Sequence, residues 1–323
     1  MLVPGLLFIL GLLCLIKGGD WFVDGATAAA RRFHVPELLI GATVVAIGTT
    51  LPEVMVSTTS ALEGHGEIAY GNAVGSVICN TALIAALTIA IRPGKADPKS
   101  LKTPVFFFFL AAVLYALYAY LIGRFTRFFG LLMLAIFIVY MVVTVRQMKG
   151  RPKSEDTEPE EQQEEPMSVP KLALLLVTGA ALIAVGAKLL VDNGTLIAQA
   201  MGVPESVIAL TFVALGTSLP ELVTAITSLV KGHSALSLGN VIGANLFNLV
   251  LVCGTSISLA PFKLPSSAML LGHNASLVLD LPLMFTVMLL LTVPALRKAR
   301  LARWQGIVLL ALYAGFCAIQ FTL

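Results

Sequence analysis

The sequence has too little charge for a soluble protein. Only 12% of its 323 residues are Asp, Glu, Lys or Arg, and 58% are hydrophobic. Soluble domains carry about 25% charged residues, so about half of the charge that a water-exposed surface needs is missing. The deficit indicates a membrane protein. The net charge of +3 is also too small to indicate a nucleic-acid partner.

Motifs of enzymes and of soft-metal sites are missing as well. The four cysteines stand apart in apolar runs without a C-x-x-C pair, so we expect them to act as small packing residues. The sequence contains no G-x-S-x-G, no H-E-x-x-H and no Asp-rich prenyl motif. We therefore expect neither an enzyme nor a permanently bound cofactor. The apolar first residues lack the basic start of a secretory signal and are expected to begin the first membrane span.

Long apolar stretches dominate what is present. A helix of about 20 apolar residues crosses a bilayer, and ten stretches suit this length, five on each side of one polar segment. They cover residues 3–29, 36–62, 68–91, 104–122, 126–147, 171–199, 204–230, 235–260, 278–295 and 305–322. The polar segment is rich in Glu and Pro, which is typical of a flexible aqueous linker. We expect an all-α membrane protein with a first five-helix unit (1–148), an acidic cytoplasmic linker (149–169) and a second five-helix unit (170–323).

The distribution of Lys and Arg predicts the orientation of the chain, because these residues concentrate in cytoplasmic loops. With the N-terminus outside, the inner loops hold sixteen of the 21 Lys and Arg residues. The outer loops then hold only Arg124, Arg127 and Lys263. We therefore predict that both termini lie on the outer side (N-out, C-out).

A duplicated segment is the strongest pattern in the sequence. A shift of 168 residues places Gly48-Thr49-Thr50-Leu51-Pro52-Glu53 on Gly216-Thr217-Ser218-Leu219-Pro220-Glu221. The same shift places Pro36 on Pro204, Asp24 on Asp192, Gly64-His65 on Gly232-His233, Gly71-Asn72 on Gly239-Asn240, Gly75 on Gly243 and Asn80 on Asn248. A unit with an odd number of spans must enter the membrane in the opposite direction the second time. The pattern predicts inverted repeats, which in transporters place the substrate site at the midplane between the halves.

The repeated motif has the chemistry of a cation site. A proline inside a helix lacks an N–H and clashes with the carbonyl four residues earlier, so Pro52 and Pro220 should break their helices and free a carbonyl. Glu53 and Glu221 follow the prolines deep inside their spans, where an ionised carboxylate is costly and is functional by default. The hydroxyls beside these breaks belong to Thr49, Thr50, Thr217 and Ser218.

The next span of each repeat adds amides, and glycines spaced four apart let helices approach closely. Asn72 and Asn80 occupy the first repeat, and Asn240, Asn245 and Asn248 the second. The ligands are thus oxygen atoms only. Hard cations prefer such ligands, and Ca²⁺ takes about six to eight of them in a flexible geometry. The motif holds no histidine or thiol that would favour a softer metal.

Other recurring or clustered residues fit structural roles. His65 and His233 each follow a glycine at a span end, where a loop or capping role is expected. Asp24 and Asp192 recur near span ends and are expected to pair or cap. The Phe106–Phe109 run is expected to face lipid.

Paired G-[TS]-[TS]-L-P-E segments, each followed by G-N-x-x-G-[SA]-x-x-x-N, resemble the two alpha repeats of the calcium/cation antiporter superfamily. The likeness spans the chain and is greatest to the prokaryotic sodium/calcium exchangers of the YrbG type. It implies a secondary antiporter that exchanges Ca²⁺ for Na⁺ in the inner (plasma) membrane and works as a monomer within the lipid bilayer. It also implies alternating access, in which the long first and sixth helices slide past the bundle.

The resemblance implies a role for single positions too. Glu53 and Glu221 match the central carboxylates that both ions share. The other matched ligands are Thr49, Thr50, Thr217 and Ser218 through hydroxyl or carbonyl oxygens, Ala46 and Ala214 through main-chain carbonyls, and Ser76, Asn80 and Asn248 through side chains. Ala244 replaces the expected partner of Ser76 and has no hydroxyl, so one sodium site loses a ligand. Potassium-dependent relatives have a carboxylate where Asn248 stands, which argues against potassium dependence.

Two alternatives remain open from the sequence. A carboxylate pair can bind protons in place of Na⁺, which would make the protein a proton-coupled cation exchanger of the same fold. A passive channel could use the same ligands, although a proline-broken inverted repeat favours alternating access.

Overall fold

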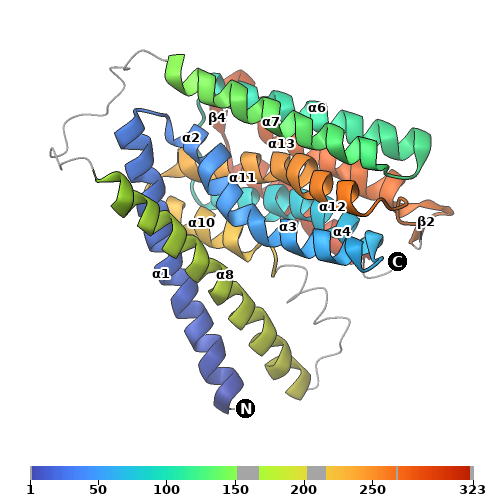
Figure 1. The fold of residues 1–323 in the computed structure, drawn as a ribbon, viewed down its shortest axis with the longest axis horizontal. Coiled ribbons are helices and arrows are strands. Elements are labelled where there is room, and N and C mark those ends of the chain that lie inside the picture. Colours follow the sequence, from blue (N-terminus) through green and yellow to red (C-terminus); the bar gives the residue numbers. More distant parts are fainter. Residues whose placement is uncertain (1, 151–166, 202–215, 267, 321–323) are drawn as a thin grey trace.

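The computed structural model describes residues 2–150, 167–201, 216–266 and 268–320, which form a bundle of helices with two short β-ribbons (Figure 1). The helices are α1 (Leu2–Phe33), α2 (Glu37–Ile40), η1 (Gly41–Val45), α3 (Ala46–Leu62), α4 (Gly66–Cys79), η2 (Asn80–Ala85), α5 (Ala86–Ile91), α6 (Pro98–Ile122), α7 (Arg127–Gly150), α8 (Val169–Ala200), α10 (Leu219–Val230), α11 (Ser234–Phe247), η4 (Asn248–Val252), α12 (Cys253–Leu259), η5 (Ser276–Asp280), α13 (Leu281–Lys298) and α14 (Arg303–Gln320), where η marks a π-helical turn. The ribbons pair β1 (Gly94–Lys95) with β4 (Arg300–Leu301) and β2 (Met269–Leu270) with β3 (His273–Asn274).

Eight helical stretches of the described chain are long and apolar enough to cross a membrane, and each overlaps an expected span. They are Leu2–Phe33, Glu37–Leu62, Gly66–Ile91, Pro98–Ile122, Arg127–Met148, Val169–Ile197, Ser234–Leu259 and Ser276–Lys298. The two remaining expected spans contain α10 and α14. Residues 204–215 of the expected seventh span and 151–166 of the expected linker lie outside the described residues.

The two long helices α1 and α8 lie side by side and antiparallel at one edge of the molecule (Figure 1). A Cβ on Gly18 would lie 2.8 Å from the α8 backbone, and a Cβ on Gly179 would lie 2.6 Å from the α1 backbone. Gly11 and Gly186 oppose each other in the same way nearer the N-terminus of α1. Glycine leaves no side chain in the contact, so the two backbones approach closely.

Local structure repeats with the 168-residue spacing of the sequence. α4 and α11 begin and end at residues 168 apart, as do the starts of η2 and η4. Gly64 and Gly232 end the preceding helices with φ of +88° and +87°, a left-handed conformation that favours glycine. The next N–H, of His65 or His233, donates back into the helix it follows, at 2.8 and 2.7 Å. Both histidines occupy the N-cap position of the following helix, in agreement with the expected loop or capping role, but neither side chain donates or accepts a capping hydrogen bond.

The aromatic run on α6 points inward as well as outward. Phe106 is 62% exposed, whereas Phe107 and Phe108 are 8% and 0% exposed and pack in the core. The expectation that the whole run faces lipid is therefore wrong. Four consecutive residues of a helix with 3.6 residues per turn cover every side of it, so part of the run must face the bundle.

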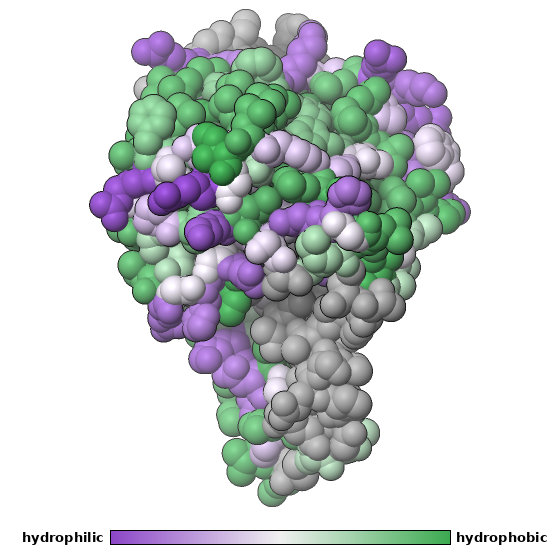
Figure 2. Space-filling model, turned by 90° about the vertical axis from the view of Figure 1, so that its right-hand side faces the viewer, coloured by the Kyte–Doolittle hydropathy of each residue, from purple (hydrophilic) through white to green (hydrophobic). Residues whose placement is uncertain are grey.

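Apolar side chains also cover much of the outer surface. Leu121, Phe128 and Met55 are 79, 74 and 67% exposed. Figure 2 looks at the end of the bundle that carries β2, where hydrophilic residues gather in patches among hydrophobic ones. Soluble monomers rarely expose large contiguous apolar surfaces, but lipid chains cover such surfaces in a bilayer.

The close approach of α1 and α8 predicts the effect of a larger side chain between them. Gly179→Val should force the helices apart and lower the melting temperature in detergent, because overpacking costs about 1–3 kcal/mol. Gly5→Ala is the matched control, since nothing lies within 4 Å of its Cβ, and it should keep the wild-type value or exceed it. Equal melting temperatures for Gly179→Val and wild type would contradict this packing.

Candidate ion-binding site

The two motif carboxylates meet in the interior of the bundle. Glu53 lies within α3 and Glu221 lies in the first turn of α10, and both are 0% exposed. Their charges are close enough to repel one another. The carboxyl of Glu221 also faces the hydroxyls of Thr49 and Thr50 from the other repeat. The fold therefore brings the two copies of the motif together.

Most polar atoms at this point have no partner within the described part of the chain. Both carboxylate oxygens of Glu53 and of Glu221 are buried and form no hydrogen bond with a described residue, and the same holds for the hydroxyls of Thr50 and Ser218. Proteins pair more than about nine in ten of their buried polar groups, so a cluster of orphaned acceptors needs an explanation. A cation bound among them would satisfy these oxygens.

Two asparagines extend the cluster from neighbouring π-helical turns. Asn80 opens η2 and Asn248 opens η4; both are 0% exposed, and their amide groups have no hydrogen-bond partner among the described residues. Cys79, directly before Asn80, lies against the Ser218 hydroxyl and near the Glu221 carboxyl. η2 packs on α10 and η4 packs on α3, so the π-helical turn of each repeat meets the motif of the other. Single π-helical turns inside α-helices occur frequently at functional sites.

Asn240 and Asn72 are held by hydrogen bonds around the cluster. Thr49 donates to the Oδ1 of Asn240 at 3.3 Å and so joins the two repeats. The Nδ2 of Asn72 donates to the Glu53 carbonyl at 3.3 Å and to the Ser57 hydroxyl at 2.8 Å. These bonds fix the backbone and hydroxyls around the carboxylates, while the carboxylate oxygens themselves stay unpaired.

Sequence analysis missed three residues of these networks. Ser57 bonds Asn72, and Thr81 accepts a hydrogen bond from Asn245 at 2.7 Å. The sulfur of Met288 lies 3.2 Å from the Asn245 amide. The 168-residue shift places an alanine opposite Ser57 and a leucine opposite Thr81, so the repeat gives no signal for either. Their only sequence signal is their place near a motif residue, since Ser57 lies one turn beyond Glu53 and Thr81 directly follows Asn80.

The remaining expected ligands differ in how deeply they are buried, and one of them lies outside the described residues. Ala46 opens α3 with its side chain fully buried, and Ser76 lies in α4 at 4% exposure. Thr217 is half-buried in the turn before α10. Ala244, opposite Ser76 in the repeat, is fully buried in α11. Ala214 lies outside the described residues.

Pro220 lies in the first turn of a described helix, whereas Pro52 lies within one. Residues 202–215 lie outside the described residues, so a break at Pro220 stays a prediction. α10 begins at Leu219, directly before Pro220 and after a turn at residues 216–218. α3, however, continues through Pro52 from Ala46 to Leu62. The expectation of a break at Pro52 is therefore wrong. The irregular turn of this span lies earlier, in η1, and a proline missing one N–H still leaves the carbonyl of Gly48 without its usual helical donor.

The arrangement can bind a hard cation. Two carboxylates, several hydroxyls and amide oxygens converge in a region closed to solvent, and oxygen ligands of this kind suit Ca²⁺ and Na⁺. Within the described ranges, no group of three or more His, Cys, Asp and Glu side chains could hold a metal ion. The site therefore lacks the nitrogen and sulfur ligands of a structural zinc centre.

Comparisons with known proteins agree with this chemistry. The family described as "Sodium/calcium exchanger protein" matches residues 3–146 and 171–322. The chain is 34% identical to the inner membrane protein YrbG of Escherichia coli over 87% of each protein. It is 29% identical to the sodium/calcium exchanger MaX1 of Methanosarcina acetivorans over 98% of each. A solved structure of the sodium-calcium exchanger NCX_Mj resembles it with a TM-score of 0.80, 33% identity and 98% coverage of both chains.

The unpaired carboxylates predict that a bound ion stabilises the fold. Adding Ca²⁺ should raise the melting temperature of the detergent-solubilised wild type, because a ligand at a hundredfold excess over its Kd adds about 2.7 kcal/mol. Glu53→Gln should abolish the rise, since it removes one of the two charges that the ion neutralises. Glu67→Gln removes an exposed carboxylate outside the site and serves as the control. A full rise in Glu53→Gln would mean that Ca²⁺ binds elsewhere.

Proposed function

The chain belongs to the sodium/calcium exchanger family, and from this premise we propose that it is a secondary antiporter that exchanges Ca²⁺ for Na⁺. The observation that carries the proposal is the pair of fully buried carboxylates, Glu53 and Glu221, whose oxygens have no partner among the described residues. Two adjacent buried charges are strongly unfavourable when they are unpaired. One Ca²⁺, or a comparable charge of Na⁺, would neutralise them.

The ion ligands that we propose lie around these two carboxylates. They are Glu53, Glu221, Thr49, Thr50, Thr217, Ser218, Ser76, Asn80 and Asn248, with the main-chain carbonyls of Ala46 and Ala214. The orphaned oxygens of Thr50, Ser218, Asn80 and Asn248 support the assignment most directly. The hydroxyl of Thr49 already donates a hydrogen bond to Asn240. This bond would hold the Thr49 oxygen in place beside the ion.

The architecture that we propose has ten spanning helices in two inverted repeats. The antiparallel packing of α1 on α8 supports the inversion, because these helices correspond under the 168-residue shift. The two matched stretches of the family support a division into residues 1–148 and 170–323 around a cytoplasmic linker. Access to the midplane site would then alternate as one part of the structure moves against the other.

The chain is a multi-pass membrane protein. We place it in the inner (plasma) membrane with both termini outside, and we expect it to act as a monomer. YrbG, which is named an inner membrane protein, supports the location.

Na⁺ is the coupling ion that the site favours. Hydroxyl and amide oxygens surround the carboxylates, and neutral oxygens coordinate Na⁺ without binding a proton. Asn248 supplies an amide where a carboxylate would offer a third proton-binding group. A proton-coupled exchange of the same fold is the competing mechanism, because the Glu53–Glu221 pair itself can take up protons.

Uptake of radioactive Ca²⁺ into proteoliposomes tests the proposal. Vesicles loaded with Na⁺ and diluted into Na⁺-free buffer should accumulate Ca²⁺, and vesicles with an outward proton gradient alone should not. Glu53→Gln and Glu221→Gln should each abolish uptake, because the remaining single charge cannot balance Ca²⁺. Glu67→Gln should transport like the wild type.

The other outcomes are equally specific. Uptake driven only by the proton gradient would leave the site in place and make the chain a proton-coupled exchanger. Ca²⁺ influx that needs no counter-ion inside the vesicle would make it a channel. Full activity in both Gln variants would refute the site.

The difference between Ser76 and Ala244 gives a separate prediction about Na⁺. Ser76→Ala should raise the Na⁺ concentration for half-maximal uptake about 2- to 10-fold, because one oxygen ligand is lost. Ala244→Ser should lower it, since a hydroxyl then stands at the equivalent position. Thr286→Val, whose hydroxyl bonds its own helix at the exposed side of α13, is the control. A shift in neither variant would remove both positions from the Na⁺ sites.

A further inference from the structure

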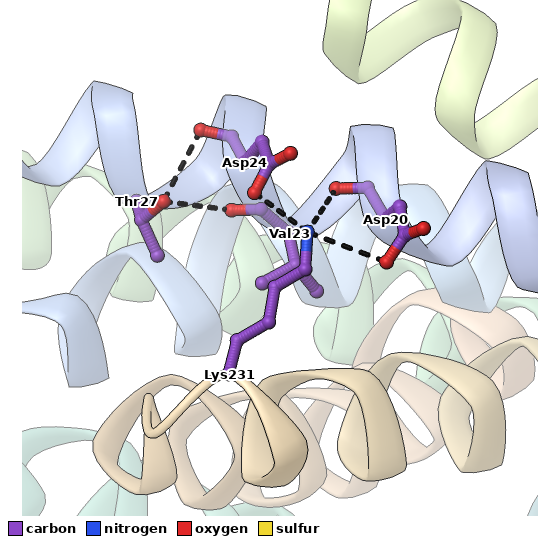
Figure 3. A network of polar contacts seen from close by, with 5 residues as sticks. All are labelled: Asp20, Val23, Asp24, Thr27 and Lys231. Carbon is purple, nitrogen blue, oxygen red and sulfur yellow. Dashed lines mark hydrogen bonds and ion pairs between the residues drawn. The ribbon is translucent and has the colours of Figure 1, made fainter.

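An ion-pair cluster ties the long helix α1 to the end of α10 (Figure 3). The Nζ of Lys231 lies 2.7 Å from Oδ1 of Asp24 and 3.4 Å from Oδ1 of Asp20, and it donates to the Asp20 carbonyl at 3.1 Å. Thr27 bonds the carbonyls of Val23 and Asp24 on the same turn of α1. One lysine thus contacts three acceptors on a helix that is distant in sequence. We call this cluster the Lys231 latch.

Two of the three latch positions carry the opposite charge at their equivalent positions in the repeats. The 168-residue shift places Asp20 on Lys188 and Lys231 on Glu63, and it places Asp24 on Asp192. A pair of opposite charges therefore exists at corresponding positions of both repeats, although each partner has changed sign. An ion pair remains attractive only if both partners change sign together. The joint change at Lys188 and Glu63 therefore suggests that these two side chains also meet.

The second pair is not formed in the structure. Lys188 bonds Asp192 on its own helix at 2.9 Å, and the two side chains are 76% and 54% exposed. Glu63 is exposed and forms no ion pair with a described residue. Near the first pair, by contrast, a Cβ on Gly19 of α1 would lie 2.8 Å from the Thr227 side chain of α10. α1 is thus seated on the end of α10, while the corresponding end of α3 is open, with Met55 67% exposed.

The two pairs lie at opposite ends of the bundle. Glu63 precedes Gly66, where the 26-residue helical stretch Gly66–Ile91 begins. At the other end of that stretch, Arg92 donates to the carbonyl of Leu229, two residues before Lys231. A helix of this length spans about 39 Å. Contacts at the two ends would therefore close different sides of the membrane.

We infer that Lys188 and Glu63 form a second latch, which closes when the Lys231 latch opens. The inference rests on the proposed alternating access of two inverted repeats. In one conformation α1 is held to α10 by Lys231 with Asp20 and Asp24. In the opposite conformation α8 is held to α3 by Glu63 with Lys188. All of these are positioning residues that set which side of the membrane the Glu53–Glu221 site faces, and none touches the ion.

The two latches offer their lysines different numbers of acceptors. Lys231 gains two carboxylates and a carbonyl when its latch closes. Lys188 has only Glu63 to gain across the helices, and Asp192 competes for it from the same helix. The difference favours the conformation described here when no ion drives the other. Removing one latch shifts the balance of the two conformations toward the other.

Cysteine cross-linking in proteoliposomes tests whether the second latch forms. In a variant without the four native cysteines, Asp24→Cys with Lys231→Cys should cross-link readily. Glu63→Cys with Lys188→Cys should cross-link at least several-fold faster than Glu63→Cys with Leu174→Cys, where Leu174 is also exposed on α8. Cross-linking should stop exchange, and reduction should restore it. A Glu63–Lys188 pair that never outpaces the Leu174 control, with Na⁺, with Ca²⁺ or with neither, would overturn the proposal.

Charge reversal separates a latch from a merely structural contact. Lys231→Glu should shift the apparent Ca²⁺ affinities on the two sides of the membrane in opposite directions by about two- to fivefold, the range expected for a partly exposed ion pair. Adding Asp20→Lys gives the Lys231 latch the same three charges as the proposed second latch and should restore both affinities. Failure of the double variant to restore them, with both variants melting like the wild type, would refute the role of charge. Cross-linking of the cysteine pairs tests the latch whichever ion is coupled to Ca²⁺ transport. Uptake that does not depend on Na⁺ would therefore count against the proposed function alone.

Discussion

The burial of two carboxylates beside each other is the constraint on which the rest of the structure depends. Glu53 and Glu221 are removed from water and repel one another, and each buried charge carries a penalty of several kcal/mol unless it is compensated. A site with this property is unstable when it is empty and ionised. If the pair binds cations as proposed, one cation must replace another there, which would explain physically why the protein exchanges ions and does not simply release one.

The duplicated fold satisfies this constraint by using the same motif twice. Each repeat supplies one carboxylate, and the π-helical turn of each packs against the motif helix of the other. The bond between Thr49 and Asn240 joins the halves at the same place. Neither repeat alone could enclose the pair, so the ion site and the interface between the halves are one structure.

The sequence predicted those parts of the site that are duplicated. Apolar length located the eight spanning stretches of the described residues, and the repeat singled out Glu53, Glu221, Asn80 and Asn248, all of which are buried. Their role as ion ligands stays a prediction. Ser57 and Thr81 have no counterpart under the shift and were missed. The sequence predicted a break at Pro52, but α3 continues through it. A proline removes one backbone hydrogen bond, and the packing of neighbouring helices decides whether the helix axis then breaks or bends. The expectation that Asp24 and Asp192 each pair is confirmed. Their lysine partners and Asp20 and Glu63 were missed, because the charge at these positions is reversed between the repeats.

Differences between the repeats matter because perfect symmetry would make the two conformations equally stable. The structure departs from symmetry at two levels. Ser76 and Ala244 differ at equivalent positions and would make the proposed ion ligands of the two repeats unequal, which would affect both proposed conformations, since they share the site. Lys231 and Glu63 lie at opposite ends of the bundle, and each would act in only one of the two proposed conformations. Changes at the ends can therefore set which side the site prefers without altering the ions it selects, and this separation lets orientation and selectivity evolve independently.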